Sequence, residues 1–458
     1  MVSTNGLEQV VDKLAKKYII TTAQYNAGVN KNFLKNIELY GEINNAEILI
    51  IPTSGKSILE EEILHESIRG YQQITKEYSL NKNLKVKDFG ARPQQINPLT
   101  GLERFAQGDK SYIMPGTKQV LKYVANSYDD IPKAIMTTGA ITLPNYNLRH
   151  RVGRIAKQDH TYGFVMVEVK NNKYFHFRHV RALKNGNFSD ITGSYKDGKF
   201  FKNPGVRSIV LGDIHPYDLD PVQHRINMEQ IKTFKPKEVF LHDVFNGKSI
   251  SHWYEGHNIR KYEVYLEQGL NLEKELRKTL NIITQYSKVA GKNNKVYIVA
   301  SNHDEHLYRY LDEGRFVGDK GNDLIASKIY TGILQHPNSR EFALQYGLSL
   351  VGKIPSNVVF LSRDSGHKVL GYELGNHGDL GANGGRGSPR SIENANSKSI
   401  TAHGHSAFII RDTYRVGTST KLRLDYNRGG YSNWTNTNAL LYDIGTVQLI
   451  NTINKSWR

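Results

Sequence analysis

The chain has 458 residues, of which 38% are hydrophobic and 23% charged, so it is long enough for two or three domains and too apolar to be disordered. It contains no cysteine, which excludes disulfides, thiolate catalysis and thiolate-bound metals and leaves His, Asp, Glu or Asn as metal ligands. The net charge of +17 favours a polyanionic partner, nucleic acid above all, although a generally basic protein would also have it.

The N-terminal part shows an α/β pattern. Residues 18–24 and 46–52 are strand-like, and residues 30–43 between them have apolar side chains at helical spacing. A strand, helix and strand in this order predict a parallel pair. Further on, residues 162–169 and 173–183 flank Asn171-Asn172 and predict a β-hairpin.

No signal peptide or membrane-length apolar run is visible, so we expect a cytoplasmic protein that does not enter a membrane. Residues 184–205 are rich in Gly, Asn and Asp and suggest a boundary. We therefore predict an N-terminal α/β accessory domain over 1–205 and a catalytic domain over 206–458.

From residue 206 short apolar strands alternate with helices. Residues 262–290 predict one long amphipathic helix, and the last sixty residues predict strands of a second sheet. An α/β sandwich with helices outside two sheets accommodates this order.

Metal-capable side chains follow five of the predicted strands. They stand in the sequences Gly-Asp-Ile-His, His-Asp-Val-Phe-Asn, Ser-Asn-His-Asp, Gly-Asn-His-Gly-Asp and Ala-His-Gly-His. Carboxyl ends of strands form the ligand crevice of open α/β sheets, so we expect these side chains to converge. The candidates are Asp213, His215, Asp243, Asn302, His303, Asp304, His377, His403 and His405.

This mixture of ligands suits two divalent cations. A shared carboxylate, here Asp243, can bridge two ions, and the neutral Asn302 keeps the ligand charge low so that both ions stay Lewis acidic. Water between them would ionise near neutral pH, and His303 could protonate the leaving oxygen. A single His at a strand end is more often structural, so only the five blocks together predict a metal site.

The ordered blocks resemble the calcineurin-like metallophosphoesterase superfamily, and the Val244-Phe245 block looks most like its DNA-repair nuclease branch. The resemblance implies a four-layer αββα sandwich. It assigns Asp213, His215, Asp243 and His405 to one metal. It assigns Asp243, Asn302, His377 and His403 to the other, with His303 as the acid and Asp304 orienting it. His336 and His367 are the rivals of His377. The whole chain also resembles the early host-takeover DNases of T5-like bacteriophages, which would place it in the host cytoplasm.

The sequence departs from the superfamily pattern at three places. His242, Ser301 and Ala402 stand where Gly is usual. His242 could touch the substrate phosphate or be a packed neighbour, and both readings stay open. The resemblance implies that Asn246 helps to hold that phosphate, and Arg386 and Arg390 could clamp it.

Basic and aromatic groups outside these blocks could contact nucleic acid. The candidates are Arg149, Arg151, Arg154 and Arg178, although a solvated basic face is as plausible for each group alone. We therefore predict a DNA-cleaving phosphodiesterase with DNA as partner and self-association as a further option. Two metal ions are expected, Mn²⁺ before Mg²⁺, Fe²⁺ or Zn²⁺. The alternatives are a phosphatase or cyclic-nucleotide phosphodiesterase, and a nucleic-acid-binding protein without turnover.

Overall fold

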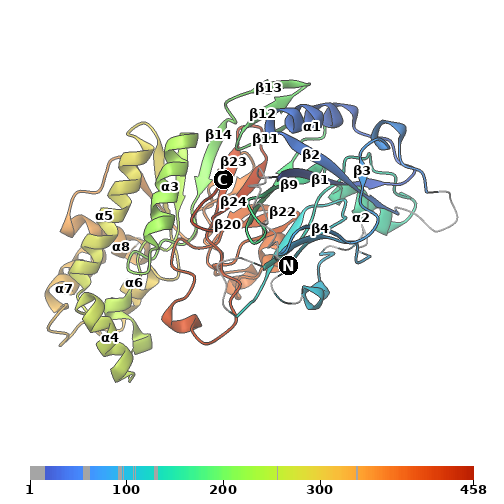
Figure 1. Ribbon diagram of the computed structural model, residues 1–458. Helices are drawn as coiled ribbons and strands as arrows, with labels where there is room; N and C mark the ends of the chain where they lie inside the picture. The colour runs from blue at the N-terminus through green and yellow to red at the C-terminus, as the bar shows by residue number, and fades with distance from the viewer. Residues whose placement is uncertain are drawn as a thin grey trace, which may run out of the picture.

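The computed structural model describes residues 16–54, 62–90, 95, 97–106, 108, 110–127, 133–254, 256–336 and 339–458. Over these residues the chain is a mixed α/β protein with nine α-helices and four sheets (Figure 1). No helix in the described ranges is long and apolar enough to cross a membrane.

A six-stranded sheet carries the first three of the predicted strand-end blocks. Its strands run in the order β17-β16-β15-β14-β23-β24, and the first four are mutually parallel. Parallel strands bring their carboxyl ends to one edge, which is why blocks far apart in sequence can meet there. The strands are β14 (Val206–Val210), β15 (Glu238–Leu241), β16 (Lys295–Val299), β17 (Val358–Leu361), β23 (Thr437–Tyr442) and β24 (Val447–Asn451).

Helices cover one face of this sheet. Alternate strand residues face opposite ways, so Ile209 packs in the core formed with the helices while Val210 packs in the core on the other face. Asp220 caps α3 through the backbone N–H groups of Val222 and Gln223. The helices of this region are α3 (Pro221–Phe234), α4 (Asn258–Gln268), α5 (Leu272–Ala290), α6 (Glu305–Asp312), α7 (Asp323–Leu334) and α8 (Ser339–Val351).

A ten-stranded sheet combines segments from both halves of the chain. C-terminal β21 pairs with N-terminal β7, so the sheet runs across the predicted boundary at residue 205. The order is β18-β19-β20-β22-β21-β7-β8-β6-β5-β4, and α9 (Pro389–Ala395) packs on β20 to β22. The strands are β4 (Tyr78–Asn81), β5 (Leu84–Val86), β6 (Ser111–Met114), β7 (Val120–Val124), β8 (Lys133–Thr137), β18 (Lys368–Val369), β19 (Tyr372–Glu373), β20 (Lys398–Thr401), β21 (Phe408–Ile410) and β22 (Asp412–Arg415).

The remaining sheets lie at the N-terminal end of the molecule. The predicted parallel pair β1–β2 and the predicted hairpin β9–β10 are confirmed, and they form one sheet in the order β10-β9-β1-β2-β3 with α1 (Lys31–Asn44) packed on it. Three short strands, β11 to β13, form a small sheet. The strands are β1 (Lys16–Gln24), β2 (Ala46–Thr53), β3 (Gln72–Gln73), β9 (Gly163–Val169), β10 (Phe175–Arg181), β11 (Phe188–Asp190), β12 (Gly193–Lys196) and β13 (Lys199–Phe201).

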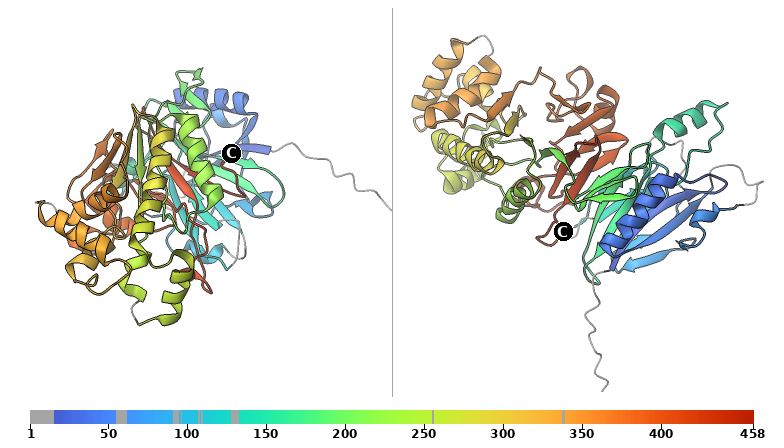
Figure 2. Two further views of the ribbon diagram at one scale, coloured as in Figure 1. Left: turned by 90° about the vertical axis from the view of Figure 1, so that its left-hand side faces the viewer. Right: turned by 90° about the horizontal axis from the view of Figure 1, so that it is seen from above.

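One hydrophobic core joins the three large sheets. It contains Val210 and Phe240 of the six-stranded sheet, Leu121 and Ile409 of the ten-stranded sheet, and Val165 of the N-terminal sheet. The C-terminal strands lie between the helical end of the molecule and the N-terminal sheet with α1 (Figure 2). Strands from both sides of residue 205 share this core. The division into two domains at residue 205 therefore stays a prediction.

Two sequence predictions need correction. The helix predicted over 262–290 is two helices, α4 and α5, because Leu270 between them has φ +46° and Asn271 caps α5. The last sixty residues do not form one second sheet. Strands β21 and β22 belong to the ten-stranded sheet, whereas β23 and β24 pair next to β14.

Candidate metal centre

The metal-capable side chains do converge at the carboxyl ends of the strands. Asp213 and His215 follow β14, Asp243 follows β15 and Asn302 follows β16. From the ten-stranded sheet, His377 follows β19, and His403 and His405 follow β20. Position 212 requires glycine, because a Cβ there would lie 2.8 Å from the backbone of Thr418. Thr418 in turn forms a β-bridge with Asp213.

Four of these side chains form a compact buried group. One ligand atom from each of Asp213, His215, Asp243 and His405 lies within 4.8 Å of every other. His405 Nε2 is 3.1 Å from Asp213 Oδ2, and His215 Nε2 is 3.3 Å from Asp243 Oδ2. These four residues could hold a metal ion, and they are the ones that the resemblance assigns to one metal.

A second group adjoins the first through Asp243. His377 Nε2 lies 3.3 Å from Asp243 Oδ2, the same carboxylate oxygen that His215 contacts. Asn302 Oδ1 is 3.1 Å from both His377 Nε2 and His403 Nδ1. Asp243 therefore contacts an imidazole of each group, as a bridging carboxylate would.

The backbone at these residues is strained. His215, Asp243, His403 and His405 all have positive φ, at 40°, 46°, 70° and 52°. Non-glycine residues rarely adopt this region, and such conformations cluster at functional sites, where the surrounding fold imposes them. Tight bends at the strand ends are what turn these side chains toward one another.

The donor set fits divalent cations. Asp243 Oδ1 is buried and has no hydrogen-bond partner among the described residues, which leaves a carboxylate oxygen without the donor it needs. Burial and Asp243 raise the pKa of Asp213, but His405 and His377 outweigh them and bring it to about 2. Burial lowers the pKa of His215, so its imidazole is neutral and its nitrogen can bind a metal.

His377 shows where positive charge is favourable. Burial lowers its pKa, but Asp243 and Asp213 outweigh burial and raise it to about 9. A proton on this buried ring balances the two carboxylates. A cation bound between the same carboxylates would take over that role and release the proton.

His303 is held at the edge of the site. Its ring packs edge-on against His215 with centroids 4.6 Å apart, and its Nδ1 lies 2.9 Å from the carbonyl oxygen of Asn246. The carbonyl of Asn246 thus provides the orienting bond that we predicted for Asp304. Asp304 instead accepts a bond from the Ser301 N–H, and burial, with Asp243, raises its pKa to about 7.

The predicted phosphate contacts are placed unequally. The amide of Asn246 already donates to Asp218 at 2.8 Å and accepts from the Tyr217 N–H at 3.0 Å. His242 is fully buried, with its Nδ1 3.3 Å from His377 Nδ1, which favours the packed-neighbour reading. Arg386 and Arg390 are exposed on the segment between β19 and β20.

The basic candidates also separate. Arg149, Arg151 and Arg154 are exposed at the start of α2 (Arg151–Asp159), where they can meet a polyanion. The predicted nucleic-acid contact at Arg178 is wrong. Its side chain is only 5% exposed and is paired with Asp190 and Glu168 in the interior. Its strand β10 is covered on both faces, which the alternating sequence did not reveal.

Arg415 of β22 is a site neighbour that the sequence did not single out. A Cβ at Gly404 would lie 2.1 Å from Arg415 Nη1, so the missing side chain between His403 and His405 makes room for the guanidinium. Arg415 Nε donates to the Ser406 carbonyl at 2.7 Å. Burial, against the charge of Asp213, lowers the pKa of Arg415 to about 10, which still leaves it charged at neutral pH.

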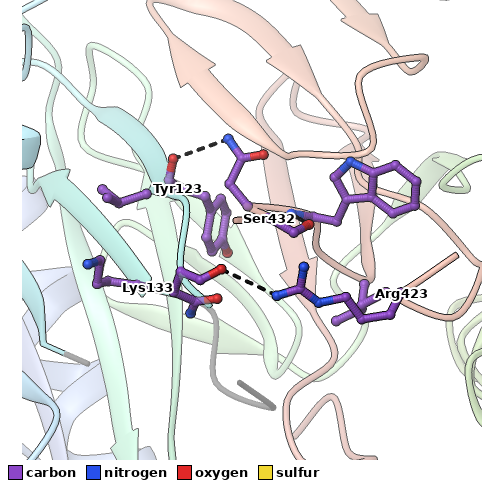
Figure 3. Close-up of a pocket in the computed structure, with 9 residues that line it drawn as sticks. Tyr123, Lys133, Arg423 and Ser432 are labelled. Atoms are coloured by element: carbon purple, nitrogen blue, oxygen red, sulfur yellow. Dashed lines mark hydrogen bonds between the residues drawn. The ribbon is translucent and has the colours of Figure 1, made fainter. Parts of the chain in front are cut away.

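Trp434 was missed as well. Its ring meets that of His405 with centroids 4.2 Å apart, and it also lines a pocket between the N-terminal strands and the C-terminal segment (Figure 3). For Arg415, the sequence contains one indication, the glycine between His403 and His405 that leaves room for its guanidinium. For Trp434 it contains none.

The chain is thus a mixed α/β protein with a buried Asp/His cluster that could hold a metal ion. No protein-family model matches it. It is similar to Protein A1 of Escherichia phage T5, at 28% identity over 477 aligned residues that cover 98% of this chain and 84% of the phage protein.

Proposed function

We propose that this chain is a metal-dependent phosphodiesterase that hydrolyses DNA, built as a four-layer αββα metallophosphoesterase. The observation that carries the proposal is the sharing of Asp243 by two adjacent ligand groups. A shared carboxylate flanked by imidazole and oxygen ligands is the arrangement of two-metal hydrolytic sites.

Two cations would be held by the groups described above. Asp213, His215, Asp243 and His405 would hold one, and Asp243, Asn302, His377 and His403 the other. The absence of thiolate ligands and the mixture of imidazole and oxygen donors suit Mn²⁺ best among common ions. When bound, such ions polarise the phosphate and lower the pKa of water enough for it to act as nucleophile at neutral pH.

The protein's own groups would position and protonate the substrate. His303 is fixed through Nδ1 by the Asn246 carbonyl, which leaves Nε2 to give a proton to the leaving oxygen. Arg415 lies against the loop that carries His403 and His405, and only its Nε has a hydrogen-bond partner among the described residues. Its terminal nitrogens can therefore bind a phosphate oxygen.

The charge of the chain supports a long polyanion as substrate. A net charge of +17 and the exposed arginines of α2 exceed what a small ester needs. With a relative encoded by a phage, the DNA of an infected cell is the substrate we propose.

Incubation with DNA tests this proposal. Purified protein is mixed with linear and circular DNA in the presence of Mn²⁺, Mg²⁺ or a chelator. We expect cleavage with Mn²⁺ and none with the chelator. If the protein hydrolyses small phosphate esters efficiently but leaves DNA intact with every metal, the nuclease proposal fails and a phosphatase takes its place.

A further inference from the structure

Lysines gather at the tip of the β12–β13 hairpin, a part of the surface that the proposed reaction does not use. Lys196 and Lys199 are paired directly across the two-residue turn Asp197-Gly198. Lys35 of α1 reaches the same turn, since a Cβ built on Gly198 would lie 2.7 Å from its Nζ. The two strands lie beside α1 (Figure 1). Three lysines from two distant segments thus meet at one turn.

The turn is held in place on α1. Asp197 and Gly198 have φ of +52° and +73°, the left-handed values that a two-residue hairpin turn needs. The Gly198 N–H donates to Asn36 at 2.7 Å, and Asn32 donates to the Asp197 carboxylate at 3.1 Å. Binding of a partner would therefore require little ordering of this backbone.

The fold does not account for these lysines. Like charges that face each other across a strand pair destabilise it. Lys35, Lys196 and Lys199 form no ion pair with any residue that the structure describes. Three further lysines are exposed on the adjoining segments, Lys31, Lys184 and Lys202. Such a surface attracts a chain of phosphates, which can neutralise several lysines at once.

Two exposed aromatic rings adjoin the lysines. Phe200 is 37% exposed and Phe201 is 49% exposed, both on the outer strand β13. The Nζ of Lys196 lies 5.8 Å from the centre of the Phe201 ring. Aromatic rings beside cations can contact bases and sugars while the cations contact phosphates. This combination favours a nucleic acid over a small anion as the partner.

The hairpin tip lies away from the metal centre. β13 ends at Phe201, and β14 follows it from Val206. The candidate ligand Asp213 follows the carboxyl end of β14, whereas the hairpin precedes its amino end. A phosphate held at the hairpin is therefore a different one from the phosphate at the metal centre.

We propose that the hairpin tip, with Lys35, Lys196, Lys199 and Phe201, is a second DNA-binding surface that holds the backbone of long DNA outside the metal centre. The inference rests on the proposed function, since the DNA it holds is the DNA that is cleaved. A dependence on substrate length follows. Long DNA reaches both surfaces, whereas a short duplex at the metal centre does not.

Binding in chelator tests this surface without catalysis. Labelled linear duplex is titrated into the full-length wild type and into Lys35→Gln/Lys196→Gln/Lys199→Gln over a range of salt. We expect binding about tenfold weaker or more in the triple variant, and a salt slope lower by about 0.9 per lost phosphate contact. Phe201→Ser should weaken binding at an unchanged salt slope, because loss of a phenyl ring releases no counterion.

A control variant lowers the net charge equally. Lys232→Gln/Lys288→Gln/Lys292→Gln removes three exposed lysines from α3, α5 and the turn after α5. Equal affinity of the wild type and the hairpin variant, or equal losses in the hairpin variant and the control, overturns the proposal. The unfolding midpoint of the hairpin variant should equal or exceed that of the wild type, since like charges are removed. A lowered midpoint would assign the lysines to the fold instead.

Cleavage with Mn²⁺ separates this proposal from the proposed function. The hairpin variant should have a lower kcat/KM than the wild type on long linear DNA, but an equal one on a duplex of about eight base pairs, which makes few phosphate contacts. Equal losses on both lengths overturn the second surface. If DNA stays intact with every metal, the nuclease proposal fails, whereas lysine-dependent affinity in chelator still supports a DNA-binding surface.

Discussion

At the scale of single residues, Asp243 links the two candidate ligand groups. Its Oδ2 is 3.3 Å from imidazoles of both ligand groups, and its Oδ1 is buried without a hydrogen-bond partner in the described ranges. Asp243→Asn keeps the shape but removes the charge. We expect Mn²⁺ affinity and DNA cleavage both to fall, since one ligand of each ion weakens. Calorimetric titration with Mn²⁺ checks this, and wild-type affinity in the variant would contradict it.

His303 has a different expected phenotype. It contacts the ligand His215 by ring packing but is itself held by a backbone carbonyl. We expect His303→Ala to keep its metals and to lose roughly 10²–10⁴ in rate, the usual contribution of a general acid. Single-turnover cleavage and metal content are measured together. Metal loss equal to that of Asp243→Asn would show that His303 is a ligand instead.

Arg415 is expected to act on the substrate. Arg415→Met removes the two terminal nitrogens beside Gly404, and we expect kcat/KM for DNA to fall by about tenfold or more at unchanged metal content. Arg415→Lys should recover only part of this, because an ammonium cannot bind phosphate in the bidentate way. Arg225→Met is the control on an exposed side chain of α3 that has no proposed contact with the substrate. If Arg415→Met loses metal, the side chain instead supports the loop that carries His403 and His405.

The sequence identified the candidate ligands because each one directly follows a strand. The carboxyl ends of parallel strands share an edge, so the convergence of Asp213, Asp243 and Asn302 follows from the strand pattern alone. Arg415 and Trp434 follow no such rule, since they reach the site from β22 and from an irregular segment. Arg178 was misjudged because a basic residue in a hairpin does not show whether its strand is covered.

At the scale of elements, β10 carries two buried histidines. Burial lowers the pKa values of His176 and His179 to about 4, and His179 Nε2 lies 2.9 Å from the Thr137 carbonyl. In the unfolded chain the pKa is about 6.5. Between these values only the unfolded chain binds the proton, so stability is present above pH 6.5 and is lost as the pH falls toward 4.

Urea unfolding at pH 7.5 and pH 5 checks this linkage. We expect the wild type to lose about 2 kcal/mol more than His179→Gln between these pH values, from the shift of one histidine. Equal losses in the two proteins would mean that His179 is protonated in the folded state.

The break between α4 and α5 shows why boundaries were harder to predict than elements. Leu266, Leu270 and Leu276 continue a helical spacing, which favoured one helix. Gly269 and Leu270 nevertheless adopt positive φ, and Asn271 accepts a bond from the Lys274 N–H as an N-cap. The Gly-Leu-Asn sequence carries that signal, but apolar periodicity outweighed it in the prediction.

At the scale of the whole molecule, charge should govern the reaction with DNA. The chain carries +17, and Arg149, Arg151 and Arg154 are exposed. We expect cleavage of DNA to weaken steeply with salt, by about 0.9 in log K per neutralised phosphate and decade of salt, whereas a small diester should show little dependence. Charge reversal at these three arginines should harm only DNA cleavage. If the charge-reversed variant shows the same salt dependence as the wild type, the arginines at the start of α2 do not contact DNA.

The arrangement of sheets was the part least accessible to prediction. The parallel order of β14 to β17 follows from alternating strands and helices. The pairing of β21 with β7 joins residues 408–410 to residues 120–122, and such long-range pairings leave no local pattern. The N-terminal part is thus built into the sheet that carries His377 and His403, and it is not simply an appendage of the C-terminal part.

Two metal-binding groups that share Asp243 should hold two ions, and the metal content of the protein measures this. The wild-type protein is purified gently, reloaded with Mn²⁺, freed of excess ion and subjected to elemental analysis. We expect about two ions per chain, as in two-metal hydrolases. No more than traces of metal would contradict it.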